Sequence, residues 1–227
     1  MVIFIKTWKN DLKWLKYCLK SIDKYGSGFE VLIVADWDCK SEIESWGLTK
    51  EVVHYCKPNF DGYLYQQYIK LRAFDYTDSE FILFMDSDCI FTEPTKPEDF
   101  FTDGKPNMLM TPYEDIPEVM FWKEATDKAT GLDVKYEFMR RNGLVYHRST
   151  LIGLWLSYSN KFLNQLKRAK NRQFSEFNMI GAYAFEYEQE KYNFVNTRDS
   201  IPHHPVRQFW SWSGLTEEDK QELNKHL

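Results

Sequence analysis

The chain has 227 residues and a net charge of −5, from 29 basic and 34 acidic side chains. This length fits one large domain or two small ones, and it is long enough to bury a substantial hydrophobic core. The acidic balance excludes the overall basic field typical of nucleic-acid-binding proteins, although the basic stretch 161–172 remains a candidate local patch.

Two further features of composition limit the class of protein. The four cysteines have no Cys-x-x-Cys spacing, which indicates reduced core thiols rather than a zinc site or a disulfide framework. The apolar run at residues 2–5 carries neither a signal-peptide pattern nor a membrane-spanning length, so we expect a soluble, cytoplasmic protein with no transmembrane segment. Aromatic residues make up 17% of the chain, which suits a sugar or small-molecule site as well as a core.

The first half of the chain is predicted to alternate between strands and helices. In chain order we expect a strand at 2–6, a helix from 10 or 11 to about 24, strands at 29–35 and near 52–53, a helix at 63–76, and a strand at 81–85. Continuous apolar strands separated by helices favour an α/β fold, with a mostly parallel mixed sheet and helices on both faces.

The second half is less regular. We expect short strands at 108–110 and 144–146, a helix from Arg148 to about Lys170, a helix at 176–187 capped by Ser175, and a terminal helix opened by a capping box at Thr216. No linker or repeat divides the chain. We therefore expect a single domain over 1–227, with a nucleotide-sugar-binding half at 1–100, an acceptor-side half at 101–212 and a C-terminal helix at 213–227.

The most informative stretch is the apolar run 81–85 followed by Asp86-Ser87-Asp88. If the strand continues, Asp86 and Asp88 lie on one face and Ser87 on the other. Two neighbouring carboxylates repel each other, and a divalent cation such as Mg²⁺ or Mn²⁺, shared with a substrate phosphate, relieves that repulsion. The alternative is an ordinary turn in which these side chains bind local backbone.

A second acidic residue, Asp36, follows the strand expected at 29–35. Ligands of open α/β sheets bind beyond the carboxyl ends of the strands. Asp36 and Asp86 are therefore expected to border one shared site.

At this point the chain resembles the nucleotide-sugar-dependent glycosyltransferases of the GT-A fold, whose DxD motif corresponds to Asp86-Ser87-Asp88. The stretch 63–72 resembles the helix that leads to this motif in several such enzymes. The stretches 136–141 and 174–183 are similar to a poorly characterised group of small bacterial and phage proteins with this Rossmann-like fold. The resemblance implies a metal-dependent hexosyltransferase that uses Mn²⁺ or Mg²⁺ and a nucleotide-diphosphate sugar, expected to be a UDP-sugar. It also implies that Asp86 contacts the donor ribose or the metal, that Asp88 is the firmer metal ligand, and that Thr7 and Asp36 line the nucleobase pocket, Asp36 accepting from a uracil N–H.

Three further groups are candidates for the same site. Gln66 and Lys70 share a helical face, and Lys70 is a candidate for a donor phosphate or a sugar hydroxyl; solvated surface is the alternative. His203 or His204 is a candidate to complete the metal shell, and a surface loop is the alternative. Arg207 is a candidate for the leaving diphosphate, and Trp210 and Trp212 for stacking on a sugar.

Glu176 is the first candidate for the base that deprotonates an acceptor hydroxyl. A favourable position near a helix N-terminus explains the same residue without catalysis. Glu114 and Asp115 are alternative bases, and Arg140 and Arg141 are candidates for acceptor binding.

Two other classes of function remain open from the sequence. A nucleotidyltransferase would also bind metals through carboxylates, but residues 6–10 lack the glycines of its phosphate loop. A non-catalytic sugar- or nucleotide-binding protein would keep the fold and lose the chemistry. The acceptor also stays open among a glycan, a lipid-linked sugar, a protein and a modified nucleic acid base.

Overall fold

The structure is a computed structural model that describes residues 1–166, 174–211 and 214–227. In these ranges the strands are β1 Val2–Thr7, β2 Glu30–Asp36, β3 Glu51–Cys56, β4 Phe81–Phe84, β5 Cys89–Phe91, β6 Phe101–Thr102, β7 Lys105–Pro112, β8 Tyr136–Glu137, β9 Leu144–His147, β10 Asn193–Asn196 and β11 Val206–Gln208. The α-helices are α1 Leu12–Tyr25, α2 Lys40–Ser45, α3 Gly62–Leu71, α4 Met120–Thr130, α5 Arg148–Leu166, α6 Glu176–Tyr187 and α7 Glu217–His226.

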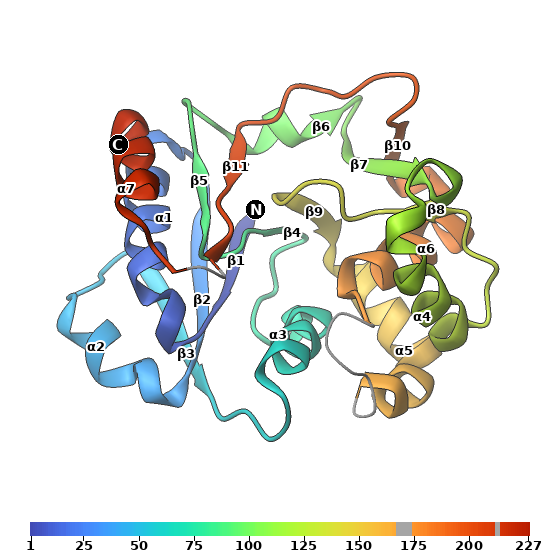
Figure 1. The fold of residues 1–227 in the computed structure, drawn as a ribbon, viewed down its shortest axis with the longest axis horizontal. Helices are drawn as coiled ribbons and strands as arrows, with labels where there is room; N and C mark the ends of the chain where they lie inside the picture. The colour runs from blue at the N-terminus through green and yellow to red at the C-terminus, as the bar shows by residue number, and fades with distance from the viewer. Residues whose placement is uncertain (167–173, 212–213) are drawn as a thin grey trace.

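The centre of the molecule is a sheet with the strand order β3-β2-β1-β4-β9 (Figure 1). The first four strands are parallel, and β9 pairs with β4 in the antiparallel direction. In the register, Phe4 of β1 lies beside Phe84 of β4, and Phe84 lies beside Leu144 of β9. The carboxyl ends of β1 and β4 therefore meet the beginning of β9 at one edge.

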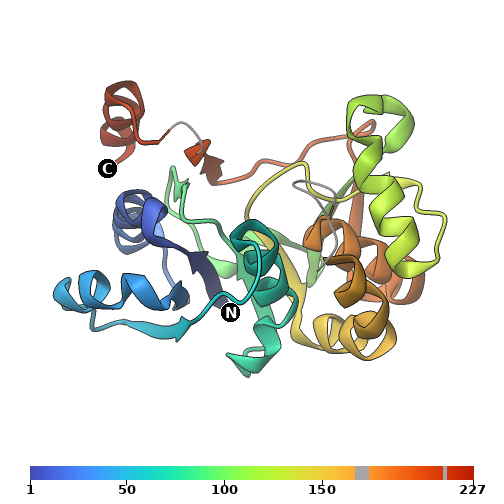
Figure 2. The same ribbon diagram turned by 60° about the horizontal axis from the view of Figure 1, so that its bottom comes forward.

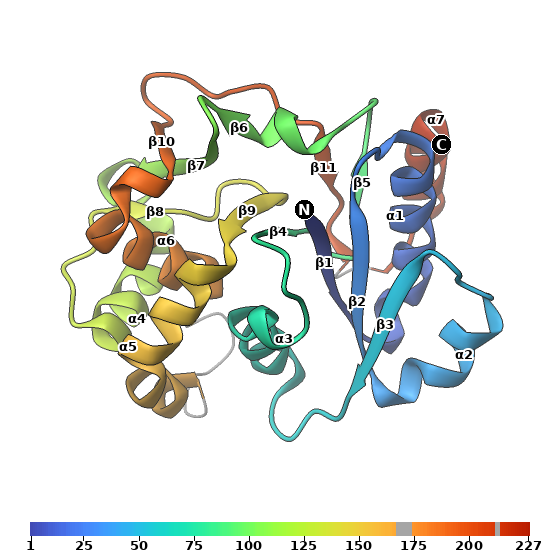
Figure 3. The same ribbon diagram turned by 180° about the vertical axis from the view of Figure 1, so that it is seen from behind.

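Helices cover both faces of this sheet, as the apolar strands require. Ile3 and Ile5 of β1 belong to a core cluster with residues of α1 and α2, whereas Val2 and Phe4 belong to another with residues of α3, α5 and α6. Alternating residues of one strand thus serve two cores, which explains why β1 is apolar from Val2 to Ile5. Figure 3 shows α1 and α2 on one side of β2 and β3, and Figure 1 shows α3, α5 and α6 on the other.

A smaller sheet with the order β10-β7-β6, to which β8 adds through β7, borders the second half. After β10 the chain runs back across the molecule to β11, which pairs antiparallel with β5 (Figure 2). The terminal helix α7 then lies beside α1, where the side chains of Lys24 and Tyr25 donate to the His226 carbonyl oxygen.

The expected strands and helices are found, with changed boundaries. The helix predicted for 63–76 ends as α3 at Leu71, and a 3₁₀ turn follows at Ala73–Asp75. The helix predicted from Arg148 is described to Leu166, so its expected end near Lys170 and most of the basic stretch 161–172 lie outside the described residues. The Ser175 cap and the capping box at Thr216 are confirmed.

The prediction that strand alternation directs the side chains of the acidic motif is wrong. The strand does not continue through the acidic motif, because β4 ends at Phe84 and a turn containing Asp86, Ser87 and Asp88 leads to β5. All three residues border the same cavity, and because they lie in a turn, strand alternation does not set the direction of their side chains. Within the described residues, no helix has the length and apolar character needed to cross a membrane.

Candidate active site

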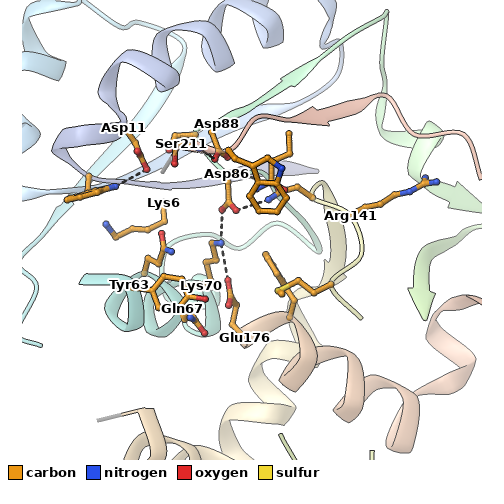
Figure 4. Close-up of a pocket in the computed structure, with 18 of the residues that line it drawn as sticks. Lys6, Asp11, Tyr63, Gln67, Lys70, Asp86, Asp88, Arg141, Glu176 and Ser211 are labelled. Atoms are coloured by element: carbon orange, nitrogen blue, oxygen red, sulfur yellow. Dashed lines mark hydrogen bonds and ion pairs between the residues drawn. The ribbon is translucent and has the colours of Figure 1, made fainter. Parts of the chain in front are cut away.

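A cavity of about 350 Å³ opens at the carboxyl ends of β1 and β4 (Figure 4). Its walls come from the end of β1, helix α3, the turn after β4, helix α4, the loop before β9, the first turn of α6 and the segment at β11. The residues that line it are Lys6, Trp8, Asp11, Tyr63, Gln66, Gln67, Lys70, Asp86, Ser87, Asp88, Trp122, Met139, Arg141, Asn142, Glu176, Phe177, Gln208, Trp210 and Ser211. The cavity thus unites segments from both halves of the chain.

Lys70 connects two of the acidic residues. Its Nζ lies 2.6 Å from Asp86 Oδ1 and 2.9 Å from Glu176 Oε1, and its side chain is only 3% exposed. The ammonium group also lies 4.6 Å from the ring centroid of Phe177. Burial opposes the charge of Lys70, but Asp86 and Glu176 outweigh that effect and raise its pKa. Lys70 is therefore a buried cation, which excludes the alternative of solvated surface.

Asp86 is held from its other side by Asn142. The Asn142 Nδ2 donates to Asp86 Oδ2 at 2.6 Å, and its Oδ1 accepts from the Asp86 backbone N–H at 3.1 Å. The topology explains the contact: because β9 runs antiparallel to β4, the residues just before β9 lie beside those just after β4. Asp86 therefore has its backbone and both carboxylate oxygens engaged.

Asp88 is positioned in a similar way by the C-terminal segment. The antiparallel pairing of β5 with β11 brings the residues after β11 beside the acidic turn. The Ser211 backbone N–H donates to Asp88 Oδ2 at 3.1 Å, and the Phe209 N–H donates to the Asp88 carbonyl at 2.8 Å.

The Asp88 carboxyl group has an unusually high pKa. Burial, followed by the negative charge of Asp86, raises the pKa of Asp88 from 3.8 to about 7, although the Ser211 hydrogen bond lowers it. Asp11 adds to the raising, and its own pKa is raised by burial. The raised pKa values of Asp88 and Asp11 therefore come first from burial, and the neighbouring carboxylates add to them.

Asp36 and Thr7 do not line the cavity. Lys6, at the end of β1, lies between them and the open space: its Nζ donates to Asp36 Oδ1 at 2.6 Å and to the Thr7 carbonyl oxygen at 2.7 Å. The buried Lys6 is thus the residue of this strand end that faces the cavity.

The structure does not bring the two adjacent histidines to the acidic turn. His203 is exposed and pairs with Glu93, whereas His204 Nε2 contacts the Asn142 carbonyl oxygen at 2.6 Å. Both line a second, smaller hollow beside the main cavity. Burial lowers the pKa of His204 to about 4. Within 1–166, 174–211 and 214–227, no three His, Cys, Asp or Glu side chains form a ready metal cluster.

Several other expected site residues also have partners outside the main cavity. Arg207 pairs with Glu222 of α7 at 2.7 Å, while Glu114 and Asp115 pair with Arg198 at the surface.

The remaining expected residues divide between the cavity and the rest of the molecule. Arg140 pairs with Glu137, but its neighbour Arg141 lines the cavity and donates to the Pro202 carbonyl at 2.5 Å. Gln66 and Trp210 line the cavity as well, and Trp212 lies outside the described residues.

Sequence reasoning missed several residues of this site, above all Lys6, Asp11, Gln67, Trp122 and Asn142. The signal for Asp11 was masked by its expected role at a helix start. The Asn142-Gly143 pair gave only a turn signal, because its contact with Asp86 depends on where β9 joins the sheet.

The fold is that of GT-A glycosyltransferases. The galactosyltransferase LgtC, solved in complex with donor and acceptor sugar analogues, matches with a TM-score of 0.60 and 11% identity over 99% of this chain and 94% of its own. An active-site mutant of LgtC matches with a TM-score of 0.58 and 11% identity, over 99% of this chain and 95% of its own. The glycosyltransferase GlyE of Streptococcus pneumoniae TIGR4 aligns more loosely, with a TM-score of 0.47 and 14% identity over 86% of this chain and 44% of its own.

The model of a family of unknown function, DUF6492, matches residues 5–178, and the chain belongs to this family. No curated protein matches the sequence.

Proposed function

We propose that the protein is a metal-dependent glycosyltransferase that moves a sugar from a nucleotide-diphosphate donor to an acceptor hydroxyl. The observation that carries the proposal is the joint position of Asp86 and Asp88 in one cavity at the carboxyl ends of parallel strands. A fold shared with LgtC over nearly the whole chain supports it. We propose UDP-sugars as the donors and a glycan or a lipid-linked sugar as the acceptor.

The donor atoms of this site fit a hard divalent cation. Asp86 and Asp88 offer carboxylate oxygens, the ligand type that Mg²⁺ and Mn²⁺ prefer. Burial and the negative charge of Asp86 raise the pKa of Asp88, so a bound cation would offset the repulsion between the two carboxylates. Because the described residues supply no third ligand nearby, the donor diphosphate and water would complete the shell. When bound there, the cation would act as a Lewis acid on the leaving diphosphate.

The cationic side chains of the cavity have separate tasks in this proposal. Lys70 holds Asp86 and Glu176 in place and adds fixed positive charge to the wall. Arg141 and Lys6 line the same cavity and would bind the phosphate oxygens. Preorganised charges of this kind stabilise a leaving group without a reorganisation cost at the moment of reaction.

Glu176 is the residue we propose as the base for the acceptor hydroxyl. It is buried in the first turn of α6, is anchored by Lys70, and borders the cavity next to Phe177. The aromatic walls formed by Tyr63, Trp122 and Trp210 suit the apolar face of a sugar. A transfer that inverts the configuration of the anomeric carbon would agree with Glu176 as the base. A transfer that retains the configuration would require a different role for Glu176.

The nucleobase would lie at the Lys6 end of the cavity. Lys6 is the buried residue that connects the cavity to Asp36 and Thr7. In this arrangement Asp36 would accept from a uracil N–H once Lys6 contacts a donor phosphate.

The proposal is tested by release of UDP from a panel of UDP-sugars, with and without Mn²⁺, in the wild type and in Asp88→Ala. We expect Mn²⁺-dependent release in the wild type and its loss in the variant. Asp115→Ala is the matched control, because Asp115 pairs with Arg198 at the surface. Full metal-independent activity in Asp88→Ala would refute the metal role, and donor binding without any turnover would favour a non-catalytic protein.

A further inference from the structure

The C-terminal segment 202–211 contacts Asp88 and also the loop residue Asn142, which holds Asp86. Near its end, Ser211 and Phe209 bind Asp88 directly through backbone N–H groups. Near its start, His204 reaches the loop that holds Asp86, and the Pro202 carbonyl accepts from Arg141. One segment thus contacts the surroundings of two residues that the turn places side by side.

The contact of His204 has a defined direction. The Asn142 carbonyl oxygen can only accept a hydrogen bond, so the His204 Nε2, 2.6 Å away, must carry a proton and donate. The side chain of the same Asn142 binds Asp86 twice, at Oδ2 and at the backbone N–H. Asn142 therefore links the two residues: its main-chain carbonyl binds His204, and its side-chain amide binds Asp86.

The backbone next to Asn142 packs tightly against the C-terminal segment. Gly143 has φ +82°, a conformation that side chains rarely adopt, and a Cβ there would lie 2.7 Å from Val206 Cγ2 and 2.9 Å from His204 Nε2. The backbone at Asn142-Gly143 thus fits closely against the C-terminal segment. Any other residue at position 143 would clash with Val206 and His204, so glycine permits this close approach.

We propose that His204 is a positioning residue of the cation site, acting on Asp86 through Asn142, and is not itself a metal ligand. The proposal rests on the proposed function in so far as a cation binds at Asp86 and Asp88. It assigns the two adjacent histidines different roles: His204 orients a carboxylate, and His203 belongs to an exposed pair with Glu93. Residues that orient metal ligands change metal affinity about 10- to 100-fold when they are lost.

The first test is Mn²⁺ binding, measured by electron paramagnetic resonance on the purified protein without substrate. We expect His204→Ala and Asn142→Ala each to weaken binding about 10- to 100-fold, and the double variant to bind no more weakly than Asn142→Ala. His203→Ala is the matched control and should bind like the wild type. The wild-type Mn²⁺ spectrum should lack coupling to an imidazole nitrogen.

The Mn²⁺-binding measurements would give other results if His204 were a direct metal ligand. If His204 ligates the metal, the losses of the two single variants should multiply in the double variant, and nitrogen coupling should be visible. Either finding overturns the proposal, as does a His204→Ala variant that binds Mn²⁺ as tightly as His203→Ala does.

The second test needs no metal, and therefore holds even if the proposed function fails. Hydrogen exchange at the Asp86 backbone amide reports the bond to Asn142. We expect exchange to accelerate about tenfold or more in His204→Ala, to stay at the wild-type rate in His203→Ala, and to recover in His204→Gln, whose amide N–H can donate to the same carbonyl. Unchanged protection in a folded His204→Ala overturns the positioning role. A wild type that binds no Mn²⁺ but keeps this exchange pattern refutes the metal function alone.

Discussion

The buried Lys70 makes the most demanding prediction about stability. Replacing it by Met keeps most of the side-chain volume but leaves Asp86 and Glu176 facing each other without the ammonium group that lies 2.6 and 2.9 Å from their oxygens. Two like charges about 5 Å apart repel by about 3 kcal/mol at an effective dielectric constant of about 20. Removing one partner of a buried ion pair costs about 3–5 kcal/mol, so we expect Lys70→Met to lose stability in that range.

Urea unfolding of the metal-free protein at pH 8 measures this loss. Adding Glu176→Gln to Lys70→Met removes one of the two charges and should restore about 1–3 kcal/mol. The matched control is Lys6→Met, since Lys6 is also buried but, among the described residues, forms an ion pair with one carboxylate, that of Asp36. Its loss should be smaller and insensitive to Glu176→Gln. A Lys70→Met variant that loses less than about 1 kcal/mol, or that gains nothing from Glu176→Gln, would refute the reasoning.

Three further predictions concern acidity, catalysis and packing. Because the pKa of Asp88 rises from 3.8 to about 7 on folding, the folded metal-free protein binds more protons than the unfolded chain between these values, and stability should fall with rising pH by up to about 1.4 kcal/mol per unit. Urea unfolding should display this slope in the wild type and not in Asp88→Asn; equal slopes would contradict it. Glu176→Gln should lower kcat for transfer about 10²- to 10⁴-fold with little change in Mn²⁺ affinity, and wild-type kcat would exclude Glu176 as the base. Gly181→Ala should lose about 1–3 kcal/mol in thermal unfolding because its Cβ would overlap the Phe138 ring, whereas Gly62→Ala, with open space around it, should not; equal effects would refute this.

The sheet and its covering helices could be predicted because their signals are local. The apolar runs at β1, β2 and β4 are long enough to indicate buried strands, and the amphipathic spacing of α1 indicates a helix packed on them. Asp86 and Asp88 both border the cavity, but not through the strand alternation that the sequence suggests. A turn between β4 and β5 directs the side chains, and strand alternation could not reveal where β4 ends.

The supports of the acidic pair could not be predicted, since they depend on pairings between distant segments. Lys70 lies on a helix face that reads as solvated, and only the packing of α3 against α6 buries it beside Glu176. Asn142 and Ser211 reach the carboxylates because β9 and β11 run antiparallel to β4 and β5. No pattern within one segment encodes those registers.

The same limit explains the residues that do not reach the main cavity. Arg207 carries the charge expected for a diphosphate, but its position in β11 directs it toward Glu222 of α7. The histidine pair was read as a metal-binding signal, whereas His204 is occupied by the Asn142 carbonyl. Residue type suggested the chemistry in both cases, and the tertiary contacts assigned the side chains to other partners.

The central claim is that Asp86 and Asp88 hold a cation for the diphosphate of a nucleotide-sugar donor. Calorimetric titration of UDP into the wild-type protein, with and without Mn²⁺, tests it most directly. We expect Mn²⁺ to raise UDP affinity by a factor within the usual range of about 5–150 for coupled ligands, and we expect this gain to vanish in Asp88→Ala. Equal UDP affinity with and without Mn²⁺ in the wild type, or an undiminished gain in Asp88→Ala, would contradict the account.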